Sequence, residues 1–257
     1  MKDRIAVIIP ARYASTRLPG KPLIPLCGKP MIRRVYERAA QIPGVDRVLV
    51  ATDDSRILEA VRDFGGEASL TPAEIRNGSE RVGFVARDLE AEIVVNLQGD
   101  EPLISTRAVG EAVRKLLDDP QAVAATLGYP LKTEAEWRNP AVVKVVTDAN
   151  GNTLYFSRAP IPFHRDEEFS PLPRLYRHIG VYVFRKAFLM EFLSWPEGTL
   201  EAREKLEQLR ILERGYSLKL VEADMLSPGV DTPEDVEAVE RLLEMQSEKT
   251  NTNQLEV

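Results

Sequence analysis

The segment that most restricts the fold of this chain lies near its N-terminus, where an apolar strand leads into a basic loop. Residues 5–9 read IAVII and are followed by Pro10, a pattern typical of a short strand buried on both faces. The loop that follows contains no acidic residue and carries three cations, Arg12, Arg17 and Lys21. Ligands bind where such strands end in open parallel sheets, and Arg and Lys side chains suit phosphate. The loop therefore predicts a phosphate site, although the loop alone leaves open a solvated basic turn.

Two well-known phosphate-binding loops do not match this segment. Gly20-Lys21 is followed by Pro22 instead of Ser or Thr, and position 15, five residues before Gly20, is a serine. The segment is therefore not a Walker A loop. The chain also lacks a G-x-G-x-x-G sequence, which excludes the dinucleotide fingerprint.

Composition restricts the class of protein. The chain has 257 residues, enough for one large domain, and its 34 Lys and Arg against 40 Asp and Glu give a net charge of −6. That balance argues against an extended nucleic-acid surface, so we expect no nucleic-acid partner. Cys27 is the single cysteine, which agrees with a reducing cytoplasm and with a small apolar role. Neither a membrane-spanning run nor a signal peptide is recognisable. We therefore expect a soluble, cytoplasmic protein without a membrane partner.

Carboxylates follow two of the predicted strands. Residues 92–97 form a strong apolar strand that runs into Gln98-Gly99-Asp100. An acidic residue after a glycine at a strand end suits a hard cation, but a turn in which Asp100 bonds its own backbone is equally compatible with the spacing. The phosphate loop favours the cation: if that loop binds a nucleoside triphosphate, which arrives with Mg²⁺, a carboxylate must hold the ion. We therefore interpret Asp100 as the first metal ligand. After the strand at 47–51, Asp54 is interpreted as a helix cap. Asp53 beside it is a weak site candidate only through the family resemblance given below.

The remaining elements predict an α/β fold with an irregular excursion. Helices are expected at 31–41, 57–64, 105–117 and 201–213, and strands at 47–51, 68–70, 123–129, 176–184 and 218–223. Residues 142–147 and 153–157 flank Asn150-Gly151, a hairpin signal, and open a β-rich insertion over about 142–184. Thr232, Pro233 and Asp235 form a helix start. The polar tail 246–257 is expected to be disordered, leaving one domain over 1–245.

A series of motifs in this chain resembles the 3-deoxy-manno-octulosonate cytidylyltransferase (CMP-Kdo synthetase) family. The motifs occur in the family's order and extend to about Leu243: P-A-R-Y-A-S-T-R-L-P-G-K-P-L, T-D-D, G-S-E-R, N-L-Q-G-D-E-P, Y-F-S-R-A-P-I-P, R-H-I-G-V-Y, L-E-Q-L-R and G-V-D-T-P-E-D. The resemblance implies a three-layer α/β sandwich with a mostly parallel central sheet, the Rossmann-like nucleotide-diphospho-sugar transferase fold. It also implies a homodimer, with the insertion contributing to the sugar pocket and the dimer contact.

The implied reaction transfers CMP from CTP to 3-deoxy-D-manno-octulosonate (Kdo), with Mg²⁺ as cofactor, and supplies CMP-Kdo for lipopolysaccharide. CTP and Kdo are therefore the expected partners. Three alternatives remain open at this point. The first is the same chemistry on another acid sugar, such as sialate or an amino-Kdo analogue. The second is a glycosyltransferase, although the Asp-x-Asp motif typical of that class is absent from the sequence. The third is a nucleotide-binding module without turnover.

The resemblance also assigns roles to individual residues. Those assigned to the nucleotide are Arg12, Arg17, Lys21, Ser79, Arg81 and Gln98. Those assigned to the acid sugar are Gln98, Arg158, His178, Tyr182, Glu207 and Gln208. Asp231 is implied as the second metal carboxylate beside Asp100, and Lys21 and Arg12 join these two as catalytic residues. From the residues alone, Ser79 is equally a helix cap, Arg158 a surface ion-pair partner, and His178 and Tyr182 two side chains on one strand face.

Overall fold

The computed structural model describes residues 4–14, 18–165 and 169–255. The chain divides into two compact units. Unit 1 comprises Met1–Ile5, Glu90–Asn96 and Arg107–Leu226, and unit 2 comprises Ala6–Leu89, Leu97–Thr106 and Ser227–Val257. Each unit thus collects segments that are distant in the sequence, and each is described separately.

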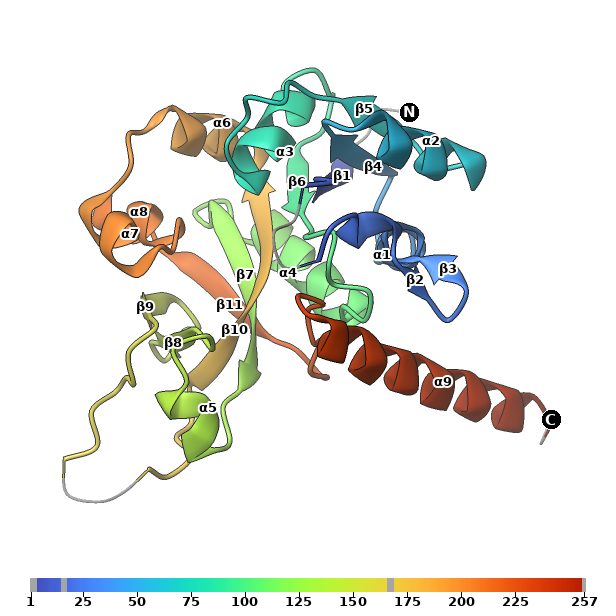
Figure 1. Ribbon diagram of the computed structural model, residues 1–257. Coiled ribbons are helices and arrows are strands. Elements are labelled where there is room, and N and C mark those ends of the chain that lie inside the picture. The colour runs from blue at the N-terminus through green and yellow to red at the C-terminus, as the bar shows by residue number, and fades with distance from the viewer. Residues whose placement is uncertain (1–3, 15–17, 166–168, 256–257) are drawn as a thin grey trace. The chain divides into compact units, whose positions relative to one another are not determined.

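Unit 2 contains a parallel arrangement of three strands covered by helices on both faces. Its elements are β1 (Ile5–Ala11), η1 (Lys21–Leu23), β2 (Pro25–Leu26), β3 (Lys29–Pro30), α1 (Met31–Ala39), β4 (Arg47–Thr52), α2 (Ser55–Asp63), β5 (Ala68–Leu70), α3 (Gly78–Ala86) and α9 (Pro233–Leu255). β4 pairs in parallel with β1 and with β5. Helices α1 and α2 lie on one face of these strands and α3 lies on the other (Figure 1). Every residue of β1 is buried, as the apolar run predicts.

Unit 1 contains the strand order β11-β7-β10-β6 and a hairpin that extends it. Its elements are β6 (Ile93–Asn96), α4 (Thr106–Asp118), β7 (Ala124–Pro130), α5 (Glu134–Arg138), β8 (Lys144–Thr147), β9 (Thr153–Ser157), β10 (Leu175–Arg185), α6 (Lys186–Ser194), α7 (Thr199–Glu204), α8 (Leu209–Glu213) and β11 (Leu218–Glu222). β11 runs parallel to β7, whereas β10 is antiparallel to both β6 and β7. The α/β class with a mostly parallel central sheet is confirmed.

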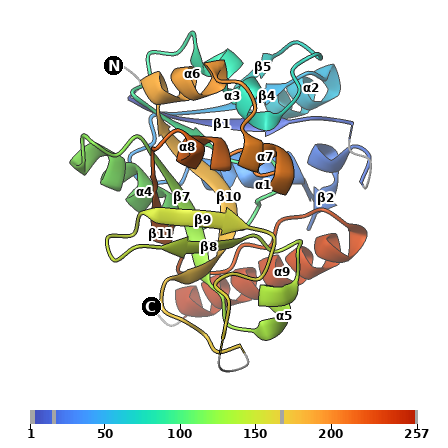
Figure 2. The ribbon, with the colours of Figure 1, turned by 90° about the vertical axis from the view of Figure 1, so that its left-hand side faces the viewer.

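The hairpin predicted at Asn150-Gly151 is present in unit 1. β8 and β9 pair antiparallel, and the N–H of Asp148 donates to Asn152 O at 2.9 Å (Figure 2). Gly151 has φ +76°, a backbone conformation that glycine adopts at no steric cost. β10 pairs with β8 through Leu175–Arg177 before it joins β7. The segment expected as an insertion therefore ends inside a strand of the main sheet.

Two stretches differ from the sequence expectation. The single helix expected at 201–213 is wrong. It is divided into α7 and α8, because Lys205 adopts φ +54°, a left-handed conformation that ends the first helix. α9 continues to Leu255, through most of the segment expected to be disordered. It starts at a strong cap, and no glycine or proline interrupts it after Pro233. Within the described residues, none of the helices combines the length and apolar character that crossing a membrane requires.

Candidate active site

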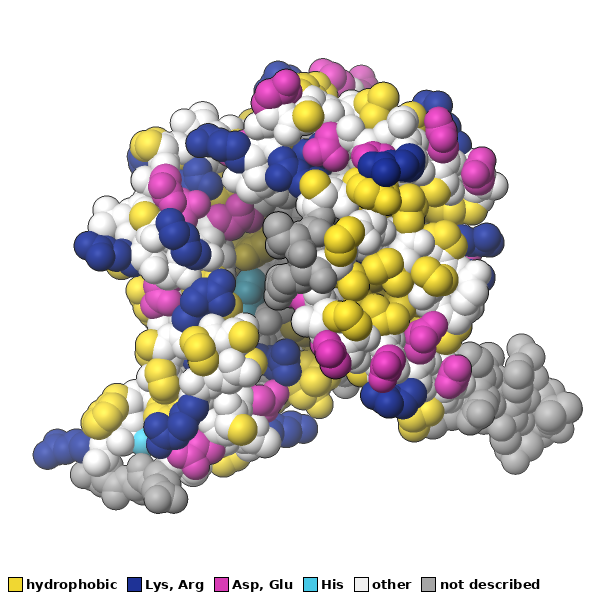
Figure 3. Space-filling model, viewed as in Figure 1, with side chains coloured by type: hydrophobic (Ala, Val, Ile, Leu, Met, Phe, Trp, Pro, Cys, Tyr) yellow, Lys and Arg dark blue, Asp and Glu magenta, His cyan; other side chains and the backbone are white. Residues whose placement is uncertain are grey.

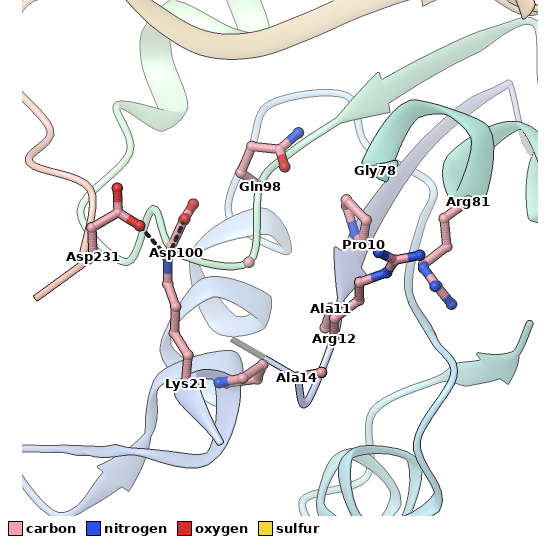
Figure 4. Close-up of a pocket in the computed structure, with 12 residues that line it drawn as sticks. Pro10, Ala11, Arg12, Ala14, Lys21, Gly78, Arg81, Gln98, Asp100 and Asp231 are labelled. Atoms are coloured by element: carbon pink, nitrogen blue, oxygen red, sulfur yellow. Dashed lines mark hydrogen bonds and ion pairs between the residues drawn. The ribbon is translucent and has the colours of Figure 1, made fainter. Parts of the chain in front are cut away.

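A pocket of about 380 Å³ opens in unit 2 at the carboxyl end of β1. Its lining comes from β1 and the following loop, from η1 and α3, and from the segments after β6 and before α9 (Figure 4). The lining residues are Pro10, Ala11, Arg12, Ala14, Lys21, Pro22, Gly78, Arg81, Gln98, Gly99, Asp100 and Asp231. The predicted phosphate loop and both predicted metal carboxylates thus border one pocket.

Close backbone approach places Asp100 beside β1. A Cβ at Gly99 would lie 3.0 Å from Pro10 O, a separation that real Cβ atoms rarely show, so any larger residue would push the two backbone segments apart. On the other side, the N–H of Val230 donates to Asp100 O at 3.0 Å. This bond ties the segment that carries Asp231 to the segment that carries Asp100. Asp231 then precedes a capping box, in which Thr232 Oγ1 accepts from the N–H of Asp235 and the Asp235 carboxylate accepts from the N–H of Thr232.

Lys21 lies between the two aspartates. Its Nζ donates to Asp100 Oδ2 at 2.6 Å and to Asp231 Oδ1 at 2.9 Å (Figure 4). The lysine side chain is 14% exposed and the carboxylates are 30% and 46% exposed, so the carboxylates retain access to a ligand. Burial by itself lowers the pKa of Lys21, but the charges and hydrogen bonds of Asp100 and Asp231 outweigh it and raise the pKa above the ordinary value. Lys21 is therefore a firmly protonated ammonium held by two acids.

A second charged group lies at the α3 side of the pocket. Arg81 is fully buried, and its Nη2 donates to Asp53 Oδ2 at 2.8 Å while its Nη1 donates to Thr71. Arg12 Nε lies 3.6 Å from the same Asp53 oxygen. Burial lowers the pKa of Arg81, the Asp53 charge opposes this, and the nearby Arg12 charge adds to the lowering. Asp53 thus holds two predicted nucleotide-binding arginines next to each other, a stronger connection to the site than the sequence gave reason to expect.

The other predicted nucleotide residues have the following positions. Gln98 lines the pocket next to Gly78. The two residues are so close that a Cβ atom at position 78 would lie 3.4 Å from Gln98 Oε1. Ser79 is buried in the first turn of α3. It is not the helix cap, because Asn77 caps α3 by accepting from the N–H of Glu80. Arg17 lies outside the described residues.

The residues predicted for the acid sugar, apart from Gln98, belong to unit 1, where several of them meet. Tyr182 on β10 donates its hydroxyl to Gln208 Oε1 at 3.0 Å, and both side chains are buried. The rings of His178 and Tyr182 lie 5.5 Å apart, which confirms that they share a strand face. Gln208 Nε2 is buried and makes no hydrogen bond within the described part of the chain. An amide donor in this condition is suited to a ligand oxygen.

The break between α7 and α8 changes the interpretation of Glu207 and Gln208. The sequence analysis placed them within one continuous helix at 201–213 and, through the resemblance, assigned them to the acid sugar. The structure places them after Lys205, where the chain turns before α8, and Gln208 is only 2% exposed. Burial, and secondarily the charge of Glu207, raises the pKa of the Tyr182 phenol. Tyr182 therefore acts as a neutral hydrogen-bonding group.

His178 is an acceptor at Nδ1, because its other nitrogen is engaged. Thr126 Oγ1 donates to Val181 O at 2.8 Å, so the same hydroxyl accepts from His178 Nε2–H at 2.8 Å. Burial lowers the pKa of His178 to about 3. The sequence analysis assigned His178 to the acid sugar without fixing which hydrogen-bonding role its ring plays. The contacts leave a neutral ring whose remaining nitrogen accepts a hydrogen bond.

We expect His178 to make the protein less stable in mild acid. Its pKa is about 3 in the folded chain and about 6.5 when unfolded. Between these values only the unfolded chain binds the proton, so the free energy of unfolding falls as pH drops below 6.5. The loss is at most about 1.4 kcal/mol per pH unit. Urea unfolding of the wild type and of His178→Asn at pH 7.5, 6.5 and 5.5 measures it. Parallel pH dependence of the two proteins would contradict the expectation.

Arg158 follows β9 in unit 1 and is held by neighbours that the sequence gave no reason to expect. Its N–H donates to Glu204 Oε2 at 2.9 Å and its Nε donates to Glu204 O at 2.9 Å. Its carbonyl accepts from the buried Lys144. Neither Glu204 nor Lys144 lies in a motif with a recognisable chemical pattern. Only the folded structure connects them to the site.

The residues present fit a magnesium ion when phosphate oxygens complete its coordination. Asp100 and Asp231 direct carboxylate oxygens at one point, where Lys21 Nζ now lies. Mg²⁺ takes one or two carboxylates together with substrate phosphates. Over the part of the chain that the structure describes, three or more Asp, Glu, His or Cys side chains do not gather as a metal-binding group.

Comparison with known proteins identifies the class. The family model for cytidylyltransferases matches residues 6–222. Among solved structures, a CMP:2-keto-3-deoxy-manno-octonic acid synthetase complexed with CTP is similar with a TM-score of 0.89. It is 43% identical, over 95% of this chain and 99% of that one. A 4-diphosphocytidyl-2C-methyl-D-erythritol synthase from Anaerococcus prevotii, 14% identical with a TM-score of 0.63, shares the fold. The family match and the shared fold define this chain as a nucleotidyltransferase.

Curated relatives define the family more narrowly. The 3-deoxy-manno-octulosonate cytidylyltransferase of Syntrophotalea carbinolica is 53% identical over 242 residues, which are 92% of this chain and 97% of the relative. The enzyme of the same name from Pelobacter propionicus is 49% identical over 95% of this chain and 99% of its own length. The chain belongs to the 3-deoxy-manno-octulosonate cytidylyltransferase family.

Proposed function

We propose that this protein transfers CMP from CTP to Kdo, releasing pyrophosphate and forming CMP-Kdo for lipopolysaccharide synthesis. The observation that carries the proposal is the convergence of Lys21, Asp100 and Asp231 on one point of a pocket in a cytidylyltransferase fold. The ammonium of Lys21 can bind the phosphates of a nucleotide, and the carboxylates of Asp100 and Asp231 can bind the metal ion that accompanies them. Family membership with close relatives of the same name supports the choice of CTP and Kdo.

In the proposed reaction, an oxygen of the sugar attacks the α-phosphorus of CTP, a new O–P bond forms, and the α–β phosphoanhydride bond breaks. The protein supplies position and charge instead of a covalent intermediate. Arg12, Arg17 and Lys21 hold the triphosphate, and Arg81 and Ser79 lie toward the base. Asp100 and Asp231 would hold Mg²⁺, which when bound neutralises phosphate charge and lowers the pKa of the attacking hydroxyl.

The residues of unit 1 bind and orient the acid sugar in this proposal. Arg158 pairs with the sugar carboxylate through its guanidinium, which matches a carboxylate in two parallel hydrogen bonds. Gln208 Nε2 donates to a sugar oxygen, and His178 Nδ1 accepts from a sugar hydroxyl. Tyr182, Glu207 and Gln98 complete the set. In this proposal these side chains bind the sugar through hydrogen bonds, and none of them donates or removes a proton in the reaction.

One assay tests the proposed function. Pyrophosphate release is measured with each of four nucleoside triphosphates, with Kdo, sialate and an amino-Kdo analogue, and with or without Mg²⁺. We expect release only with CTP, Kdo and Mg²⁺ together. Faster pyrophosphate release with another acid sugar would show that this sugar, and not Kdo, is the substrate. Absence of release with every sugar would leave a binding module and overturn the proposal.

We further propose that the enzyme is a cytoplasmic homodimer in which the β-rich segment of unit 1 forms the contact. In this segment Leu154 is 60% exposed and Phe163 is 84% exposed, and hydrophobic side chains are visible over it (Figure 3). Exposed large apolar side chains commonly mark protein contacts. Light scattering coupled to size exclusion is expected to give twice the chain mass of 28.8 kDa. A monomeric mass at micromolar concentration would contradict the proposal.

A further inference from the structure

Four protein contacts fix Arg158, two on its backbone and two on its side chain. Its N–H donates to Glu204 Oε2 at 2.9 Å and its carbonyl accepts from Lys144 Nζ at 2.7 Å. Its Nε donates to Glu204 O at 2.9 Å and its Nη1 to Pro140 O at 3.2 Å. Backbone and guanidinium are therefore both held by neighbouring residues, which restricts the rotation of the side chain.

Glu204 is the common element of this arrangement. It is the last residue of α7, and its second carboxylate oxygen, Oε1, accepts from the buried Ser157 Oγ at 2.6 Å. Both carboxylate oxygens and the backbone carbonyl of Glu204 thus accept from Ser157 or Arg158. Because the Glu204 carboxylate is engaged with Ser157 and Arg158, we expect its effect on the reaction to pass through Arg158.

Lys144 holds the opposite side. Its side chain is fully buried, and its ammonium donates to three backbone carbonyls, those of Asn139, Val142 and Arg158, at 2.8, 2.6 and 2.7 Å. An ammonium has three donors, so all of them are used. Burying a charged ammonium is unfavourable unless hydrogen bonds compensate for the lost water. The three bonds supply that compensation, and one of them holds the backbone of Arg158 in place. Burial lowers the pKa of Lys144, and the charge of Glu204 counters this.

The contacts leave one edge of the guanidinium available. Nε and one hydrogen of Nη1 bond to carbonyls, so within the described contacts the hydrogens of Nη2 and the second hydrogen of Nη1 remain for a ligand. Two parallel donors from one guanidinium match a carboxylate. We infer that Glu204 and Lys144 are positioning residues, which fix Arg158 so that this edge faces the carboxylate of the acid sugar. The inference rests on the proposed function.

The test compares Glu204→Ala with Arg158→Ala in steady-state kinetics. Because a loosened guanidinium loses the advantage of prior orientation, we expect the sugar KM of Glu204→Ala to rise about 10- to 100-fold. The CTP dissociation constant, measured by calorimetry without sugar, should stay within about twofold, since the nucleotide pocket lies in unit 2. Glu134→Ala, which removes an exposed α5 carboxylate paired with Arg138, is the matched control and should leave both constants unchanged.

Conservative variants separate positioning from a general loss of structure. Glu204→Gln can turn its amide oxygen to the N–H of Arg158 and its amide nitrogen to Ser157 Oγ, which can accept. It should therefore recover most of the sugar KM lost in Glu204→Ala. Glu204→Asp keeps the charge but withdraws the carboxylate by one methylene, and should resemble the alanine variant. The aspartate variant also provides the measurement if Glu204→Ala does not fold.

A double variant decides whether Glu204 acts through Arg158. If it does, Arg158→Ala/Glu204→Ala has the same sugar KM as Arg158→Ala alone. Effects that multiply would overturn the inference. A normal sugar KM in Glu204→Ala and Glu204→Asp, beside a raised one in Arg158→Ala, would overturn it while the proposed function stands. A normal sugar KM in Arg158→Ala would remove Arg158 from the sugar site and refute both the inference and that part of the proposed function.

Discussion

Replacement of Asp100 by asparagine is expected to reduce kcat about 100- to 1000-fold while the protein remains folded. Asparagine preserves the shape of the side chain and one oxygen, but it removes the negative charge directed at Lys21 and at the proposed Mg²⁺. The backbone contacts that position this residue, Gly99 against Pro10 O and the bond from Val230 to Asp100 O, do not involve the carboxylate. The measurement is pyrophosphate release at saturating CTP and sugar over a range of Mg²⁺ concentrations, with a thermal melt for folding.

Asp63→Asn serves as the matched control, because Asp63 is an exposed carboxylate at the end of α2 in the same unit. It should leave kcat unchanged. Asp231→Asn should show the loss seen with Asp100→Asn, since both carboxylates contact the same ammonium. If Asp100→Asn keeps a near-normal Mg²⁺-dependent rate, the metal assignment is wrong and the pair serves only to hold Lys21.

Local patterns predicted the parts of this site that are encoded by neighbouring residues. The buried β1 followed from five consecutive apolar residues, the cap at Thr232 from its spacing to Asp235, and the β8–β9 hairpin from Asn150-Gly151. In each case the physical cause lies within a few residues of the chain. Side-chain burial, an unpaired helix N–H or a positive φ is enough to decide the outcome.

The convergence at Lys21 is a different matter, because its partners lie 79 and 210 residues away in the sequence. Residue types at the ends of strands could suggest that Lys21 and Asp100 share a sheet edge. Nothing in composition or spacing could add Asp231, which precedes α9 and is connected through the bond from Val230 to Asp100 O. Its role as a second carboxylate came from the family resemblance alone.

Other features were missed because tertiary contacts overrode local preference. The apolar spacing at 201–213 favoured one helix, yet Lys205 turns the chain and buries Gln208. Glu204 and Lys144 are ordinary charged residues in sequence. Their value lies in contacts with Arg158 that only the fold creates.

Replacement of Lys21 by methionine is expected to lower kcat about 1000-fold and, without nucleotide, to increase the affinity of the protein for a divalent cation. The Lys21 ammonium lies 2.6 Å from an oxygen of Asp100 and 2.9 Å from an oxygen of Asp231. A cation that binds these oxygens must compete with it. Methionine keeps the apolar stem and removes the competing charge, leaving two facing carboxylates without their counter-ion. We expect Mn²⁺, measured by electron paramagnetic resonance, to bind at least about tenfold more tightly, which corresponds to about 1.4 kcal/mol.

Two further variants serve as controls for the Mn²⁺ measurement. Lys29→Met removes an ammonium paired with Glu37 in the same unit, and it should bind Mn²⁺ as the wild type does. Adding Asp100→Asn to Lys21→Met should abolish the gain, because one of the two carboxylates that recruit the ion is then neutral. Equal Mn²⁺ affinity in wild type and Lys21→Met would show that the ion binds elsewhere. The expected pattern, in contrast, implies that Lys21 and a divalent cation compete for the same two carboxylates.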